Sequence, residues 1–165
     1  MANNLYALRL AKTYSLDVVL GLGLNIFNRE SACVLGKNLK VRAYIASQEL
    51  SLKDIRDNLS DAYIFAGGDI TVMTVAHCPI KVNFGNKTGR KFPLKRKRIA
   101  RCYFEIENCV PLNGTRKIDF PGNFFLKFDG DEREVAHFSL LAQGVDDGYR
   151  KNGQYTAGHL SNSVK

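Results

Sequence analysis

The sequence predicts an α/β fold built on a parallel sheet. Apolar, β-branched segments alternate along the chain with segments of helical periodicity, which is typical of βα units around such a sheet. The apolar fraction of 45% and the charged fraction of 24% match those of soluble globular proteins. Because a complete eight-unit barrel takes about 250 residues, we expect a partial (β/α) barrel of about four βα units. We expect residues 1–165 to form a single domain.

The first half of the chain alternates regularly between helices and strands. Apolar side chains recur at spacings of three to four over residues 3–14, which predicts a helix. The β-branched run at 17–26 predicts a strand that is buried on both faces. The next expected elements are a helix over 29–36, a strand over 41–46, a helix that starts at Ser51 and a strand over 62–66.

The segment from about 77 to 122 interrupts this alternation. It contains all four prolines and three of the four cysteines, so we expect an inserted loop with short strands such as 101–107. Regular order resumes with a strand over 124–128. A helix over 131–143 follows, acidic in its first turn as the helix dipole favours.

The net charge of +8 comes from one part of the inserted loop. Between Lys81 and Arg101 there are nine Lys or Arg residues and no acidic residue, whereas the rest of the chain has 15 basic and 16 acidic residues. We predict that the densest part binds a polyanion such as RNA through phosphate contacts. A solvated loop without a partner is the alternative. The predicted polyanion-binding residues are Lys95, Arg96, Lys97 and Arg98.

Several classes of protein are disfavoured by what the sequence lacks. Its longest apolar run, at 18–24, has seven residues, far fewer than the roughly 20 of a membrane span. Its N-terminus has no signal-peptide pattern, so we expect a cytoplasmic protein with free thiols or metal ligands. Serine-hydrolase and zinc-protease motifs are absent. His137 falls within a predicted helix, where we expect a packing or surface role.

Six segments carry a more specific resemblance. They are GLGLNIFN (21–28), IASQELSLKDI (45–55), AGGDITVMTVAHCPI (66–80), NKTGRKFPL (86–94), CYFEIENCVPL (102–112) and YTAGHLSNSV (155–164). In this order they resemble the patterns of the collagenase-like peptidases, peptidase family U 32. The resemblance implies peptide-bond hydrolysis by an unassigned mechanism.

The resemblance covers only the later part of the family's catalytic domain. It implies that the chain corresponds to the C-terminal half of a barrel whose earlier strands are absent. We therefore expect a truncated or fragmentary form, and leave open whether it is active alone. Because a partial barrel leaves an open strand edge, we expect self-association or pairing with a separate N-terminal half-barrel.

Polar residues that follow predicted strands are the candidates for a substrate site. The C-terminal strand ends of a parallel barrel carry its active site, and Asn25, Asn28 and Glu49 come just after two predicted strands. The alternatives are helix capping for Asn28 and loop hydrogen bonding for the other two. The sequence assigns no catalytic residue.

The family is associated with a cysteine-held iron–sulfur cluster or metal, and this implication transfers to Cys78 and Cys102. Cys109 and His77 are the further ligand candidates, since zinc or a cluster takes about four soft ligands. The chain lacks the family's further cysteines before the FP segment, and Asn86-Lys87 replaces its Asp-Arg pair. The alternative is a set of thiols that hold no ion.

Two other functions stay open beside peptide hydrolysis. Some relatives of the family hydroxylate bases in RNA, so the cysteines and the basic run also suit an iron–sulfur-dependent hydroxylase of RNA bases or of a quinone precursor. A non-catalytic RNA-binding remnant is the third possibility. The expected substrate is therefore a peptide or RNA.

Overall fold

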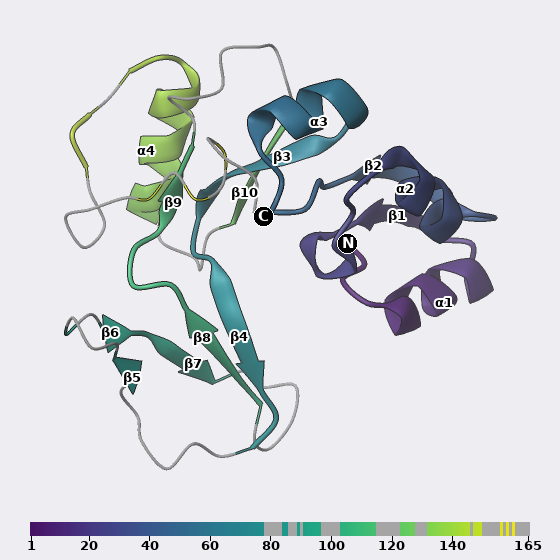
Figure 1. Cartoon of the computed structure of the whole chain (residues 1–165), viewed down its shortest axis with the longest axis horizontal. Helices are drawn as coiled ribbons and strands as arrows, with labels where there is room; N and C mark the ends of the chain where they lie inside the picture. Colours follow the sequence, from purple (N-terminus) through teal and green to yellow (C-terminus); the bar gives the residue numbers. More distant parts are fainter. Residues whose placement is uncertain are drawn as a thin grey trace. The chain divides into compact units, whose positions relative to one another are not determined.

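The computed structural model is described here for the residues whose placement is defined, and Figure 1 shows their helices and strands. These residues are 1–77, 84–85, 89, 91–96, 103–114, 123–127, 132–145, 147–149, 156, 158 and 160. The chain divides into two units. The first comprises Met1–Ala66, Gly114–Leu126 and Ala157–Lys165, and the second comprises Gly67–Asn113 and Lys127–Thr156.

Parallel strand pairing organises the first unit. Its elements are α1 (Leu5–Thr13), β1 (Asp17–Leu20), η1 (Leu22–Leu24), α2 (Arg29–Gly36), β2 (Lys40–Tyr44), α3 (Leu52–Asn58) and the start of β3 (Tyr63–Gly68). β1 pairs in parallel with β2, with Asp17 opposite Lys40. Single parallel bridges extend this pairing from Ala2 to β1 and from Ile45 to β3. The strands therefore follow one another across the sheet in chain order.

Side-chain caps begin the helices of the first unit. Asn4 accepts a hydrogen bond from the first turn of α1. Asn28 and Ser31 form a capping box at the start of α2, and Ser51 and Asp54 form another at the start of α3. Such caps satisfy backbone N–H groups that have no partner inside the helix. They explain why α2 and α3 begin where the sequence predicts, whereas α1 begins at Leu5, two residues after the predicted start.

The core of the first unit collects apolar side chains from each strand and helix. Val18 and Leu20 of β1 point into it, and Asp17 is exposed, which is the alternation expected of a strand. Leu160, far along the chain, belongs to the same core. Other members are Ala2, Leu8, Ile26, Ala46, Leu50, Ile55, Leu59 and Ile64.

The strand predicted over 17–26 is too long. β1 ends at Leu20, and the chain then turns into η1. Asn3 lies against this turn, so that a Cβ atom on Gly21 would stand 2.0 Å from the Asn3 side-chain oxygen. Only glycine allows so close an approach. The apolar pattern continues past Leu20, but the approach of Asn3 is a tertiary contact that the pattern does not contain.

Antiparallel pairing dominates the second unit. Its elements are β4 (Thr71–Val75), β5 (Phe84–Gly85), β6 (Lys91–Phe92), β7 (Leu94–Arg96), β8 (Phe104–Glu107), β9 (Leu112–Asn113) and α4 (Glu132–Ala142). β8 lies between β4 and β7, and β5 pairs with β6. The predicted inserted loop therefore contains an antiparallel sheet, and the short strand expected over 101–107 corresponds to β8.

β3 runs from the first unit into the second, and it lies between β10 (Asn123–Lys127) and β9. At its end Gly68 has a left-handed φ of +108°, and a Cβ atom there would stand 1.8 Å from the Lys127 carbonyl oxygen. The predicted strand at 124–128 and helix at 131–143 correspond to β10 and α4.

The α/β class predicted from the sequence is confirmed in its coarser form, because the structure combines helices with parallel and antiparallel strands. The described strands do not close into a barrel. No helix within the described ranges is both long and apolar enough to cross a membrane.

Replacing Gly68 with alanine should destabilise the fold much more than the same change at Gly144. Both glycines have positive φ, but a Cβ atom on Gly144 would meet nothing within 4 Å. We expect about 1–2 kcal/mol of backbone strain at Gly144, and about 2–5 kcal/mol at Gly68, where a clash with the Lys127 backbone is added. Urea unfolding measures both. Equal losses would show that β3 does not approach Lys127 so closely.

Candidate functional site

Two segments that follow parallel strands are held side by side in the first unit. A parallel bridge joins Ile26, after β1, to Ala46, after β2. The Ser47 N–H donates to the Ile26 carbonyl oxygen at 2.9 Å. Because parallel strands end at the same edge of a sheet, residues about 20 positions apart in the chain meet here.

A short chain of hydrogen bonds links the polar residues of this edge. The Ser47 hydroxyl, in a residue that is only 2% exposed, donates to Asn25 Oδ1 at 2.5 Å. The same hydroxyl oxygen accepts the Glu49 backbone N–H at 3.2 Å. Asn25 is held with a left-handed φ of +50°. We call Asn25, Ser47 and Glu49 the strand-end cluster.

The strand-end cluster presents chemically complementary groups to solvent. Asn25 and Glu49 are exposed, and Ser47 lies beneath them. With its oxygen held by Ser47, the Asn25 amide can offer N–H donors, while the Glu49 carboxylate accepts hydrogen bonds and protons. A donor and an acceptor at one edge suit a ligand that has both C=O and N–H groups.

Asn28, the third predicted site residue, has a different role. Its side-chain oxygen accepts the Ser31 N–H at 2.8 Å, and the Ser31 hydroxyl completes the capping box. This is the capping alternative considered from the sequence. Ser47 was absent from the predicted site residues, although it stands two positions before Glu49.

The metal-ligand prediction falls largely on residues outside those described. Cys78 and Cys102 both lie there. Cys109 is a half-buried free thiol whose backbone N–H donates to Asn108 Oδ1 at 3.0 Å, and His77 is exposed. Among the described residues, no three His, Cys, Asp or Glu side chains gather in a way that would hold a metal ion.

Of the four predicted polyanion-binding residues, the structure describes Lys95 and Arg96, which lie in β7. The Lys95 ammonium, within the second unit, is paired with Glu107 Oε2 at 2.7 Å and with Asp69 Oδ2 at 3.2 Å. Two carboxylates therefore already neutralise this cation, which leaves it little attraction for phosphate. Arg96 ends β7, and Lys97 and Arg98 lie outside the described residues.

His137 of α4 is fully buried, in agreement with a packing role, and its Nδ1 is hydrogen-bonded to Asp147. The Tyr149 ring packs edge-on at 5.4 Å from the imidazole, and the Arg133 guanidinium lies 5.0 Å from the centre of the Tyr149 ring. The hydrogen bonds from His137 and from the Tyr149 N–H hold the pKa of Asp147 below its usual range. Asp147 falls in a polar tail, where no local pattern marks it as a partner of His137.

Comparison with known proteins identifies no relative: no family model, curated protein or solved structure matches the chain.

A double-mutant cycle tests the hydrogen bond inside the strand-end cluster. Asn25→Gly keeps the left-handed backbone and removes the acceptor, and Ser47→Ala removes the donor. Each change should lower the free energy of unfolding by about 1–3 kcal/mol, with a coupling of about 1 kcal/mol. Ser139→Ala, which removes an exposed hydroxyl of α4, should change it by less than about 0.5 kcal/mol. Additive losses in the cycle would mean that the two side chains do not interact.

Asp147→Asn should lower stability in a pH-dependent way. A carboxyl whose pKa is lowered by folding contributes stability that is present above its unfolded pKa, near 3.9, and is lost as pH falls through the lower folded pKa. The gap between wild type and Asp147→Asn in urea unfolding should therefore be widest above about pH 4 and close on further acidification. A gap that stays constant to the lowest accessible pH would contradict the pairing with His137.

Proposed function

We propose that the chain is part of a collagenase-like peptidase of family U 32 and that its substrate is a polypeptide. The observation that carries the proposal is the strand-end cluster, which lies where parallel α/β proteins place their active sites. All three of its residues, Asn25, Ser47 and Glu49, belong to segments that resemble the family. The ordered motifs along the rest of the chain give further support.

The cluster suits an extended peptide. The Asn25 amide can donate to a substrate carbonyl group, and Ser47 holds this amide in place from below. The exposed Glu49 carboxylate is positioned by its own backbone N–H, which donates to Ser47. Glu49 then accepts a proton from the water that attacks the peptide carbonyl carbon, and returns it to the amine that leaves.

The proposed step runs through Glu49 and water and assigns no role to a metal or iron–sulfur cluster. Cys78 and Cys102, the leading ligand candidates, lie outside the described residues. If Glu49 alone supplies the base, hydrolysis persists after metal removal. The described strands do not close into a barrel, so the proposed active form includes a second copy or a separate N-terminal half-barrel.

Peptide hydrolysis is preferred to the RNA-directed functions because of Lys95. The RNA-binding hypothesis and the hydroxylation of RNA bases both need the basic run as a phosphate contact. Within residues 95–98 of this run, Lys95 has the one lysine side chain that the structure describes. It is paired with Asp69 and Glu107 instead of being free to contact phosphate. Among the described contacts, no ion pair involves the Glu49 carboxylate, and the hydrogen bond that Glu49 makes comes from its backbone N–H.

Glu49→Gln should reduce peptide hydrolysis by about 10²-fold or more, the usual contribution of a general base. The assay is the release of fluorescence from quenched gelatin, measured with and without chelator over a range of protein concentrations. Glu30→Gln, an exposed change in the first turn of α2, should leave the rate unchanged. Equal rates for wild type and Glu49→Gln would exclude Glu49 as the base, and wild-type protein that cleaves no gelatin at any concentration would refute a peptidase that acts alone or by self-association.

A further inference from the structure

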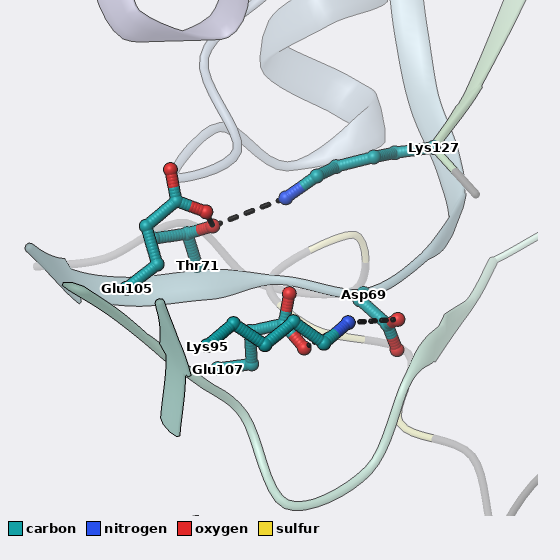
Figure 2. A network of polar contacts seen from close by, with 6 residues as sticks. All are labelled: Asp69, Thr71, Lys95, Glu105, Glu107 and Lys127. Atoms are coloured by element: carbon teal, nitrogen blue, oxygen red, sulfur yellow. Dashed lines mark hydrogen bonds and ion pairs between the residues drawn. The ribbon is translucent and has the colours of Figure 1, made fainter. Parts of the chain in front are cut away.

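The second unit contains a network of charged and hydroxyl side chains on and beside its antiparallel sheet. Figure 2 shows the Lys95 side chain extending along Glu107 toward Asp69. The Lys95 ammonium stands 2.7 Å from Glu107 Oε2 and 3.2 Å from Asp69 Oδ2. Beside them, the Thr71 hydroxyl donates to Glu105 and accepts from Lys127, each at 3.1 Å.

Antiparallel pairing brings these residues together. Glu105 and Glu107 are two positions apart along β8, so their side chains point to the same face of its sheet. β7 and β4 flank β8 on its two sides, and each carries one further member, Lys95 on β7 and Thr71 on β4. The sheet therefore places Lys95, Glu107, Thr71 and Glu105, while Asp69 comes from the connection between β3 and β4 and Lys127 from the end of β10.

Glu107 is the residue whose bonding is incomplete. Its side chain is 3% exposed, and its Oε1 atom has no hydrogen-bond partner among the described residues. A buried, unpaired carboxylate oxygen is costly, and native structures seldom keep one without a reason. Because Oε2 holds the Lys95 ammonium, Oε1 is a remaining acceptor that points to a missing N–H or O–H donor.

We propose that Glu107 and Asp69 form a binding subsite for a guanidinium group, such as an arginine side chain, and that Lys95 is its internal, displaceable occupant. The Lys95 ammonium already shows how a cation sits between the two carboxylates. A guanidinium has five N–H donors in a planar fork, enough to reach both oxygens of Glu107 where an ammonium leaves one unused. The subsite does not depend on the proposed peptidase activity.

Other ligand classes fit the subsite less well. A divalent metal ion would have to share the network with two ammonium groups, those of Lys95 and Lys127, and the described residues provide no set of three metal ligands. An anion would be repelled by the open carboxylate oxygen. Charge-assisted N–H donors gain the most at a buried carboxylate. Lys95 is 34% exposed, so its side chain marks the route by which a ligand enters.

Binding of N-acetylarginine amide, measured by titration calorimetry on the full chain, tests the proposal. The neutral isostere N-acetylcitrulline amide is the ligand control. Lys95→Met removes the occupant and should tighten binding by about tenfold, as expected when one charge-assisted interaction no longer competes. Lys95→Arg supplies a guanidinium from the chain itself and should weaken binding by about the same factor.

Glu107→Gln should abolish binding, and Asp69→Asn gives a second test if Glu107→Gln does not fold. Glu132→Gln, an exposed change in α4, should leave binding unchanged. The proposal fails if neither wild type nor Lys95→Met binds saturably at millimolar ligand, which would leave a buried water as the partner of Oε1. It also fails if the citrulline compound binds equally, or if the Lys95 and Glu107 variants bind like wild type.

Discussion

The parallel register of β1 and β2 is the constraint on which the first unit depends. It sets Ala2, β1, β2 and β3 in chain order across the sheet and ends β1 and β2 at one edge. The bridge between Ile26 and Ala46 carries this register beyond the strands and delivers Asn25 to Ser47. A slip of one residue would turn the buried side chains to the wrong face, so the same pairing that fills the core also assembles the strand-end cluster.

The second unit shows how an antiparallel sheet accommodates buried charge. Burying a carboxylate such as Glu107 is unfavourable unless an opposite charge and hydrogen bonds compensate. β7 supplies this compensation by placing Lys95 across from β8. Lys95 therefore belongs to the interior chemistry of the sheet, although it lies in a run of basic residues that resembles a solvated surface.

Local chemistry made several elements predictable. The helix expected over 29–36 has these bounds in the structure because its cap, Asn28 with Ser31, lies within four residues of sequence. The strand expected over 17–26 was overextended because its end is imposed by Asn3, which approaches from outside the segment. The inserted loop was expected from its prolines, but its antiparallel pairing was not, since short strands have no strong periodicity.

The sequence by itself determined the alternation of strands and helices, the helix caps and the placing of Asn25 and Glu49 after strands, because these features depend on residues close together in the chain. The tertiary structure alone decided that Ser47 joins Asn25 to Glu49, that Asp147 pairs with His137, and that Lys95 is enclosed by Asp69 and Glu107. Each of these contacts depends on strand register or on the packing of the chain around α4. A local sequence pattern predicts neither the strand register nor this packing, because the burial and hydrogen bonding of the whole unit select the pairing partners.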